Sequence, residues 1–496
     1  MRRRTFLTGL AAAPTLPILG RSARAQGNLV GQIAAFVQAA LDHWQVPGAA
    51  VAVIHEGKRL LVEGYGVKNS VSGGKVDSHT AFHIGSCSKA YTACAAAIAI
   101  EDGRIGWDVP VRKFLPELEL YDPQITAAVT LRDLLSHRVG LSRAWVGEYG
   151  SDLTRKQMLL RAAQAGRRAG FRERMCYSNL GFVVAAETVG RAAGVPFEDF
   201  LDSRVLRPLG MADSTGQARS WLARSNIAAP HRVTDDRVQT VPLMDHDNLM
   251  GAGSLCVSAH DAATWLECQL GTRSLVSPAN LREMHSPQIM EPERHGLGWT
   301  IGTFRGEPFV GHTGHTRGFN CRTRVDPAAG YAAFAAVNAE GSAAEAIVAY
   351  IGQVLDRNPA RDWIAFFDGF RARWIAETNG KMDEDRAADA LTGASVPALD
   401  TFAGAYRDGG MGTLTLRERD GALRIAIQDL SLYDGWLVRY GGMHFAHQMD
   451  GFRANKDRRP VSASTRFRFH AHEGRIVAAE WLDAWMGPVR FERVSQ

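Results

Sequence analysis

A serine and a lysine lie three positions apart in the stretch Ser86-Cys87-Ser88-Lys89. If a helix begins here, the hydroxyl and the amine lie one helical turn apart on the same face. A serine hydroxyl is a poor nucleophile until a base takes its proton, and a lysine amine among apolar residues can lose its own proton near neutral pH. The apolar run 93–100 predicts such a buried helix, with Gly103 as its C-terminal cap. The pair is a candidate nucleophile and base, although a surface helix with a capping serine fits the same residues.

A phenol and an amide follow in Tyr177-Ser178-Asn179, at the start of another apolar helical pattern. A phenol beside Lys89 can shuttle protons, because a neighbouring positive charge favours its ionised form. The amide of Asn179 can hold both a substrate carbonyl and the lysine ammonium. The alternative is an ordinary helix start, in which Ser178 or Asn179 is the cap and Tyr177 packs against the core.

The segment 311–319, Gly-His-Thr-Gly-His-Thr-Arg-Gly-Phe, places histidines between glycines beside a predicted strand. Gly314 would let a substrate backbone approach the strand edge, where the imidazole of His312 could donate a hydrogen bond to a carboxylate. The backbone N–H groups of His315 and of Ser86, at a helix N-terminus, would stabilise a developing oxyanion. A glycine-rich turn with surface histidines is the alternative. A metal site that includes His246 is disfavoured because no metal-ligand spacing such as H-E-x-x-H occurs, so we expect neither metal nor cofactor.

Secondary-structure patterns indicate how the chain would position these groups. A helix, two strands around the turn Glu56-Gly57, several helices, three strands and a last helix follow one another along the chain. The ranges are 29–41, 49–54, 59–67, 107–115, 131–135, 158–165, 298–303, 321–325, 331–338 and 343–355. This order predicts an α+β fold in which both ends of a domain form one antiparallel sheet, flanked by helices and carrying a helical insert.

The last part of the sequence has a different pattern. An apolar helix over 363–374 and a polar stretch over 381–395, interpreted as a connector, come first. Short alternating strands follow at 413–416 and 423–427, and again at 467–472 and 476–481, each pair around an acid-glycine turn. Hairpins at this density predict a small C-terminal antiparallel β-barrel.

The N-terminus and the overall composition limit the classes of function. Residues 1–25 combine paired arginines, a mildly apolar core interrupted by prolines and a small-residue cleavage pattern, which predicts a twin-arginine signal peptide and a periplasmic or secreted protein. The formal net charge is +5, and this segment holds five arginines and no acid, so the remainder has a net charge of zero. We therefore expect no nucleic-acid partner and no stable membrane insertion. The six cysteines lack metal-ligand spacing and are expected to be buried thiols, although a disulfide of unknown pairing is the alternative.

Ser-x-x-Lys, Tyr-x-Asn and His-Thr-Gly, in this order, resemble the penicillin-recognising serine hydrolases, which include class C β-lactamases, D-alanyl-D-alanine carboxypeptidases, D-aminopeptidases and related esterases. The resemblance extends to 103–108, 131–137 and 207–211 and covers about 29–355. Segment 402–406 is similar to the lipocalin-like barrel appended to some members. The implied domains are a signal peptide (1–25), a β-lactamase-like hydrolase domain (26–357), a connector (358–397) and a lipocalin-like barrel (398–496).

The resemblance implies that Ser86 forms an acyl-enzyme while Lys89 and Tyr177 move its proton. It also implies that Asn179 positions a substrate amide and that the strand of His312, Gly314 and His315 holds the substrate. Most β-lactamases and carboxypeptidases have lysine where this sequence has His312, and histidine is similar to D-aminopeptidases, D-amino-acid amidases and some esterases.

We therefore expect an exported serine hydrolase that cleaves amide bonds of small peptides, including those with D-residues, with esterase activity as a side reaction. The alternatives are a class C-like β-lactamase and a non-catalytic ligand-binding or sensor protein on a hydrolase scaffold. The expected partner is a small-molecule or peptide substrate, and the sequence leaves a homo-oligomer open.

Overall fold

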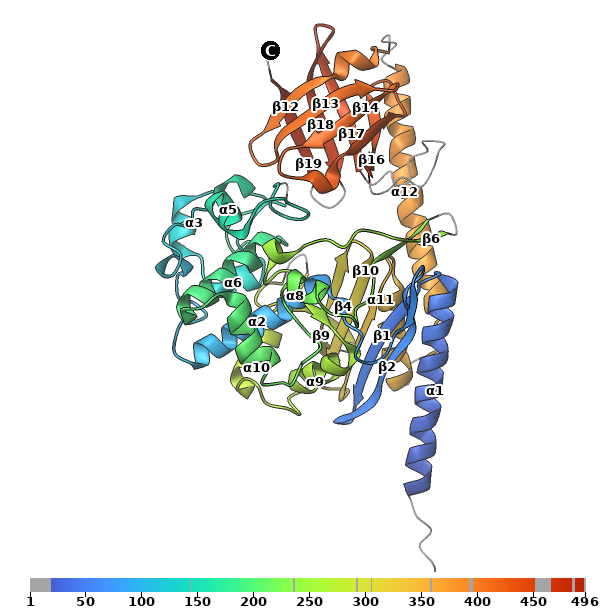
Figure 1. The fold of residues 1–496 in the computed structure, drawn as a ribbon. Helices are drawn as coiled ribbons and strands as arrows, with labels where there is room; N and C mark the ends of the chain where they lie inside the picture. The colour runs from blue at the N-terminus through green and yellow to red at the C-terminus, as the bar shows by residue number, and fades with distance from the viewer. Residues whose placement is uncertain are drawn as a thin grey trace, which may run out of the picture.

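The computed structural model describes residues 19–143, 145–234, 237–290, 293–304, 306–356, 359–391, 396–450, 465–483 and 487–494. A layered domain of helices and sheet forms the larger part, and a barrel forms the smaller part (Figure 1). The long helix α12 (Trp363–Leu391) runs from the layered domain to the barrel (Figure 1). The polar stretch interpreted as a connector is therefore helical as far as Leu391.

An antiparallel sheet is the centre of the layered domain. Its strand order is β3-β2-β1-β11-β10-β9-β8, so the N-terminal strands pair with the C-terminal ones through β1 and β11. The strands are β1 (Gly48–His55), β2 (Lys58–Asn69), β3 (Gly73–Lys75), β8 (Thr300–Phe304), β9 (Glu307–Thr316), β10 (Phe319–Asp326) and β11 (Tyr331–Val337). This arrangement confirms the predicted α+β sheet made from both ends of the domain.

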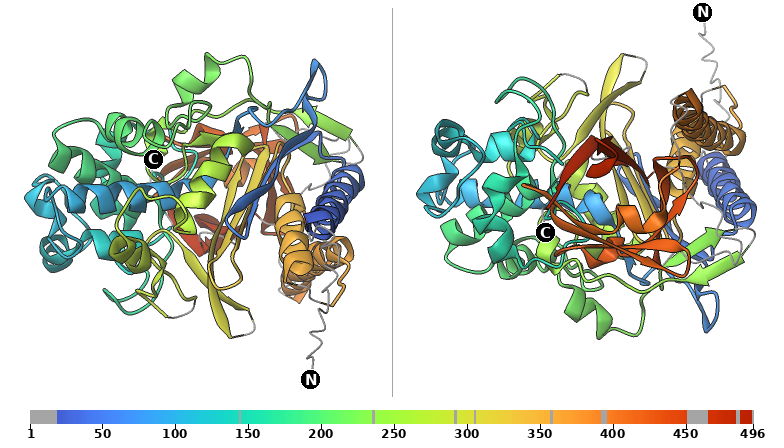
Figure 2. Two further views of the ribbon diagram at one scale, coloured as in Figure 1. Left: turned by 90° about the horizontal axis from the view of Figure 1, so that it is seen from below. Right: turned by 90° about the horizontal axis from the view of Figure 1, so that it is seen from above.

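Alternation along β1 distributes its side chains to two cores, because successive residues of a strand point to opposite faces. Ala50, Ala52 and Ile54 belong to the larger core, which includes α2 (Ser88–Glu101). Ala49, Val51 and Val53 pack on the opposite face with α1 (Leu19–His43) and α11 (Ala343–Leu355). Figure 2 shows α1 and α12 side by side on that outer face of the sheet.

The helical insert lies at the other side of the domain, where α2 packs against α6 (Figure 1). The remaining helices are α3 (Pro123–Ala128), α4 (Leu131–Leu135), α5 (Arg155–Leu160), α6 (Asn179–Ala193), α7 (Phe197–Leu201), α8 (Ala218–Leu222), α9 (Ala259–Gln269) and α10 (Pro278–His285). The helix predicted over 107–115 is wrong, since only a short 3-10 turn forms at Val111–Lys113. Pro110 precedes that turn with an extended ψ of 126°, and proline disfavours helix in the residue before it.

Two short ribbons complete the layered domain: β4 (Phe82–His83) with β7 (Cys256–Val257), and β5 (His231–Thr234) with β6 (Arg237–Thr240). All six cysteines are buried and free. Within the described residues, no single helix is long and apolar enough for a bilayer span, and one bent pair, Asn179–Ala193 with Phe197–Leu206, meets that criterion by length and composition.

The C-terminal strands close into an antiparallel barrel, as predicted. They are β12 (Gly404–Asp408), β13 (Gly412–Arg419), β14 (Ala422–Ile427), β15 (Gly435–Arg439), β16 (His444–Met449), β17 (Thr465–His472), β18 (Arg475–Asp483) and β19 (Gly487–Arg493). Buried aromatic side chains such as Phe445, Phe467 and Trp481 fill its interior. The barrel lies above the junction of insert and sheet (Figures 1 and 2). Its likeness to lipocalins stays a prediction, as do the domain boundaries and the signal peptide, of which residues 1–18 lie outside the described residues.

Candidate active site

Ser86 lies in a 3-10 turn (Gly85–Cys87) that leads directly into α2. Gly314 of β9 packs against this turn so closely that a Cβ there would lie 1.9 Å from the carbonyl oxygen of Ile84 and 3.2 Å from the Ser86 nitrogen. A Cβ on Gly85, whose φ is +51°, would lie 2.9 Å from the His315 nitrogen. The sequence therefore needs glycine at both positions, and the backbone amides of Ser86 and His315 border one small region.

Lys89 is fully buried one turn after Ser86, as the spacing predicts. Its Nζ lies 3.1 Å from Ser86 Oγ and donates to Asn179 Oδ1 at 2.7 Å and to the carbonyl oxygen of Ala252 at 2.8 Å. Burial lowers the pKa of Lys89 to about 7, against the opposing effect of the Glu148 carboxylate. A substantial fraction of the lysine is therefore neutral near pH 7, with two N–H groups held and a lone pair left for Ser86.

Tyr177 contacts the same oxygen from the other side. Its hydroxyl lies 2.7 Å from Ser86 Oγ, and Lys89 Nζ lies 4.8 Å from the centre of its ring. Burial raises the pKa of Tyr177 above its usual value, although the bond to Ser86 opposes this. Tyr177 is therefore a protonated donor at neutral pH in the free protein, and Lys89 is the better base of the two.

Glu148 organises the start of α6, where the motif residues meet. Its carboxylate accepts hydrogen bonds from the Asn179 backbone N–H at 2.7 Å and from Ser178 Oγ at 3.2 Å, and its carbonyl oxygen accepts one from Asn179 Nδ2 at 2.9 Å. The guanidinium of Arg143 lies 3.6 Å from this carboxylate and 5.1 Å from the centre of the Tyr177 ring. The side-chain oxygen and the side-chain nitrogen of Asn179 thus both have partners within the protein, and Asn179 still borders the pocket.

His137 fixes the backbone on both sides of Tyr177. Its carbonyl oxygen accepts from the Cys176 N–H at 2.7 Å, and its Nδ1 accepts from the Ser178 N–H at 3.1 Å. Its ring lies 4.3 Å from the Tyr177 ring, centre to centre. His137 has a φ of +59°, an unfavourable value for a residue with a side chain, so its position is imposed by these contacts.

Two further histidines in the lining of the pocket each keep one nitrogen unprotonated. His312 Nδ1 lies 2.6 Å from the carbonyl oxygen of Thr313, and His295 Nδ1 lies 2.8 Å from that of Gly296. A carbonyl oxygen can only accept, so each Nδ1 carries the proton and each Nε2 keeps a lone pair. Burial lowers the pKa of His295 to about 4 and holds that of His312 well below its usual value, so both rings are neutral at pH 7.

The pocket has a volume of about 680 Å³ and includes Ser86, Tyr177, Asn179, His312 and His315 in its lining. Leu432, Tyr433 and Met449 of the barrel also line it. The side chain of His315 is half exposed and bonds to Asn320 at 2.9 Å, so its backbone is the part nearer to the nucleophile turn.

Hydrogen bonds between the insert and the barrel fix this third wall of the pocket. The Asp152 carboxylate accepts from the Ser431 N–H at 2.8 Å and from its hydroxyl at 2.7 Å, while Arg161 pairs with Asp429 at 2.9 Å. A Cβ on Gly150 would lie 2.3 Å from Leu432 Cδ2, so the barrel loop packs directly against the insert. The barrel thus borders the cleft of its own chain.

Every motif residue predicted from the sequence therefore lies at one pocket. The residues that sequence reasoning missed are Glu148, Arg143, His137, His295 and the barrel residues, and none of them belongs to a motif. His137 lies in the segment 131–137, which carries part of the family resemblance, and its positive φ is visible in the structure.

Comparisons with known proteins agree with this geometry. A family model described as Beta-lactamase matches residues 33–355. Unguisins hydrolase ungD' of Aspergillus campestris is 27% identical over 351 residues, which are 65% of this chain and 64% of that protein. Penicillin-binding protein 4 of Amycolatopsis lactamdurans is 26% identical over 319 residues, 59% of this chain and 83% of that protein. The chain therefore spans slightly less than two thirds of the first of these relatives.

Solved structures share the fold. An octameric penicillin-binding protein homologue from Pyrococcus abyssi covers 93% of this chain and 99% of its own, with a TM-score of 0.62 and 20% identity. The structure of SurE covers 95% of this chain and all of its own, with a TM-score of 0.58 and 19% identity. A D-stereospecific amidohydrolase from Streptomyces sp. covers 61% and 94%, with a TM-score of 0.51 and 24% identity. The first two matches extend over nearly the whole chain, barrel included.

Proposed function

Because this chain belongs to the β-lactamase family, whose members are serine hydrolases, we propose that it cleaves amide bonds of small peptides through an acyl-enzyme on Ser86. One observation carries the proposal: Ser86 Oγ lies between the amine of Lys89, at 3.1 Å, and the phenol of Tyr177, at 2.7 Å. This contact supplies both the base that removes a proton from the nucleophile and a donor for the leaving group.

The reaction follows from the protonation states. Neutral Lys89 accepts the Ser86 proton as Oγ attacks the substrate carbonyl carbon, and the carbonyl π electrons move to the oxygen. The backbone N–H groups of Ser86 and His315 stabilise that oxyanion. The carbon–nitrogen bond then breaks, Tyr177 gives its proton to the leaving nitrogen, and the Lys89 ammonium replaces the proton on Tyr177. Water hydrolyses the ester by the same steps in reverse order.

The two neutral imidazoles define the class of substrate. The Nε2 atoms of His295 and His312 are buried, and no protein partner for them lies within hydrogen-bonding distance among the described residues. A buried acceptor without a partner is costly, so a substrate that donates to these nitrogens, once the rings turn toward it, is favoured over one that presents a carboxylate. A protonated amino group has up to three N–H donors. We therefore assign the pocket to substrates with a free amino group next to the scissile amide.

Relatives support a peptide or amino-acid amide substrate. The similar proteins include a hydrolase of unguisins, a D-stereospecific amidohydrolase and SurE solved with D-Leu. We extend the proposal to substrates with D-residues on this ground. The proposal also includes ester cleavage as a side reaction and export of the protein. A homo-oligomer is proposed as well, with the octameric homologue as its support.

The test compares D-alanine p-nitroanilide with propionyl p-nitroanilide, which differs only by lacking the amino group, and repeats the comparison with L-alanine. We expect the loss of a charged hydrogen-bond donor to lower kcat/KM about 10- to 100-fold. Mass spectrometry of the protein with an activated ester should show acylation of Ser86 in parallel. Equal turnover of both anilides would contradict the substrate class, whereas a folded protein that no ester, anilide or β-lactam acylates would contradict the hydrolase itself.

A further inference from the structure

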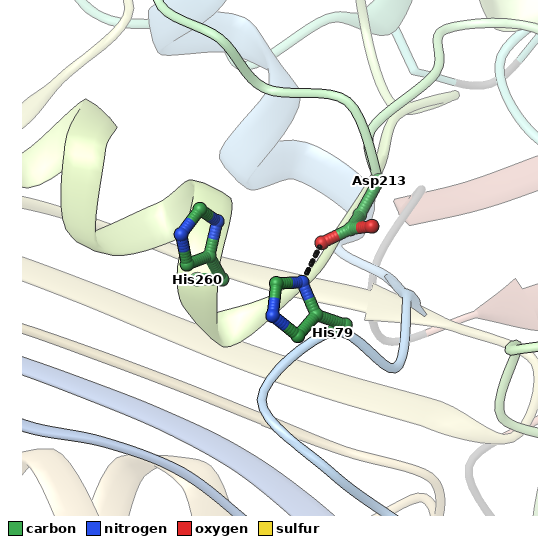
Figure 3. Close-up of side chains that lie close together, drawn as sticks. All are labelled: His79, Asp213 and His260. Atoms are coloured by element: carbon green, nitrogen blue, oxygen red, sulfur yellow. Dashed lines mark hydrogen bonds and ion pairs between the residues drawn. The ribbon is translucent and has the colours of Figure 1, made fainter.

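A second group of polar side chains lies outside the pocket, on the surface of the same domain. His79, Asp213 and His260 come from three distant parts of the sequence, and their candidate ligand atoms all lie within 4.8 Å of one another. Figure 3 shows the His79 imidazole bonded to the Asp213 carboxylate, with the His260 ring beside it. Within the residues that the structure describes, this is the one group of three or more histidine, cysteine or acidic side chains with such spacing. We propose that His79, Asp213 and His260 bind a divalent transition-metal ion of the zinc type.

The backbone around this histidine cluster is fixed by hydrogen bonds that do not involve the three side chains. The His260 N–H donates to the Ser78 carbonyl oxygen at 2.9 Å, which ties the start of α9 to the loop of His79. The Asp213 N–H donates to Asp261 Oδ2 at 2.9 Å, which ties the third segment to the same helix. Asp261 is 1% exposed and belongs to the buried frame beneath the cluster. The three candidate ligands therefore start from fixed positions, as a metal site requires.

Two of the three candidate ligands are already in contact. His79 Nδ1 lies 2.8 Å from Asp213 Oδ2, so a proton now occupies the space between them (Figure 3). Zinc bonds of about 2.1 Å to nitrogen and oxygen place tetrahedral ligands about 3.4 Å apart. The side chain of His79 is 53% exposed and can move by the few tenths of an ångström required. The ion would then replace this proton, which moves to His79 Nε2.

His260 supplies the third ligand. Its ring lies 4.6 Å from the His79 ring, centre to centre, and its Nδ1 lies 3.3 Å from Asp261 Oδ1. A carboxylate on one nitrogen of a histidine fixes the ring and makes the other nitrogen a better ligand, and this pattern accompanies many metal-bound histidines. His260 Nε2 is therefore the expected donor, after the ring turns from its present position stacked on His79 at an interplanar angle of 28°. Ser258 Oγ donates to Asp213 Oδ2 at 3.0 Å and holds that carboxylate in the same way.

Ligand type and exposure select the ion. Two imidazoles and one carboxylate suit zinc, cobalt, nickel or copper, whereas magnesium and calcium require mostly oxygen ligands. The side chains of Asp213 and His260 are 26% and 41% exposed, so water can reach the fourth coordination position. The expected role is to clamp the loop of His79, which leads through β4 to Ser86, against α9 and the segment of Asp213.

The experiment uses the full mature chain without a histidine tag, stripped of metal with EDTA. We expect one equivalent of Co²⁺ to give the visible absorption of a four-coordinate nitrogen–oxygen site, and one equivalent of Zn²⁺ to displace it. His79→Gln, Asp213→Asn and His260→Gln should each weaken zinc binding by more than about 100-fold, the upper end of the loss that removal of an outer hydrogen bond causes at metal sites. These uncharged amide side chains are polar and of similar length to the originals, and circular dichroism checks that each variant folds.

A matched control is His472→Gln, which removes an exposed histidine of β17 in the barrel and should leave zinc affinity unchanged. Anomalous diffraction from a cobalt-soaked crystal should place the ion between His79 and His260. The proposal is overturned if the wild-type chain binds no stoichiometric ion at micromolar zinc, if the three variants bind as the wild type does, or if the anomalous peak lies on other residues.

Discussion

Two clusters of side chains lie close to each other along the chain, since only six residues separate His79 from Ser86. The nucleophile cluster consists of Ser86, Lys89 and Tyr177. The histidine cluster consists of His79, Asp213 and His260. Their environments are opposite. Lys89 is fully buried, and each N–H of its ammonium has a protein acceptor. In the histidine cluster, more than half of the His79 side chain is exposed to solvent.

This difference in burial determines which chemistry each cluster can perform. Water cannot stabilise the Lys89 ammonium, so its pKa falls to about 7 and the amine becomes a base. In the histidine cluster, solvent access lets a hydrated ion enter and lets a ring adjust its position. A buried group of fixed geometry therefore suits proton transfer, and an exposed group on a fixed frame suits capture of a cation.

The largest expected effect is a loss of turnover that leaves zinc binding by the histidine cluster unchanged. Ser86→Ala removes the nucleophile, so we expect amide turnover to fall by a factor on the order of 10⁴ or more. The melting temperature and the zinc affinity should stay unchanged, because the lost hydroxyl has partners only within the nucleophile cluster. Steady-state kinetics and calorimetry measure the two quantities. Ser72→Ala, in the exposed turn before β3, is the control, and retained turnover in Ser86→Ala would place the nucleophile elsewhere.

A smaller loss is expected from Lys89→Ala, which removes the base and keeps the nucleophile. General base catalysis contributes about 10²- to 10⁴-fold, so the rate of Ser86 acylation should fall within that range. Stopped-flow acylation by p-nitrophenyl acetate measures this step directly. Lys58→Ala changes an exposed lysine at the start of β2 and should acylate as the wild type does. If Lys89→Ala acylates at full speed, Tyr177 and not Lys89 is the base.

The pH dependence of acylation tests whether burial makes Lys89 a base near neutral pH. The reactive form of Lys89 is the neutral amine, and its pKa is lowered to about 7, so the fraction of active protein rises with pH. With an ester that does not ionise, kcat/KM should rise about tenfold per pH unit below pH 6 and level off above pH 8. Burial lowers the pKa of His295 to about 4, so this ring stays neutral over most of that range. A profile that is flat from pH 5 to pH 8 would mean that Lys89 is not the titrating base.

Local patterns explain what the sequence could predict of the fold. The turns Glu56-Gly57, Asp420-Gly421 and Glu473-Gly474 all have positive φ at both residues, as tight hairpins require, and each lies between two strand-like runs in the sequence. Helix α11 was predicted with its observed bounds because it is strongly apolar on one face. The helix predicted over 107–115 does not form, because Pro110 interrupts the apolar spacing.

The sites show the limit of local patterns. Ser86 and Lys89 could be paired because one helical turn sets their distance, and the other motifs were added by resemblance. Glu148 bonds Asn179 across 31 residues, and the ligands of the proposed metal site come from positions 79, 213 and 260. Such contacts depend on how whole elements pack, and a single sequence contains no spacing that reports them.

The smallest expected effect comes from the barrel wall of the cleft. This wall extends the comparison to a region where the side chain in question makes apolar contacts. Leu432 lines the pocket opposite the nucleophile turn and packs against Gly150, so Leu432→Ala enlarges the cleft without changing a polar contact. A difference of one methylene in an apolar pocket changes discrimination by about 1 kcal/mol or more, so the ratio of kcat/KM for a tripeptide to that for an amino-acid amide should rise by at least about fivefold. The acylation rate with p-nitrophenyl acetate, which is too small to reach the barrel, should stay the same. Leu160→Ala on the exposed face of α5 is the matched control. An equal change for all substrates would show that the barrel supports the nucleophile cluster instead of selecting substrates by size.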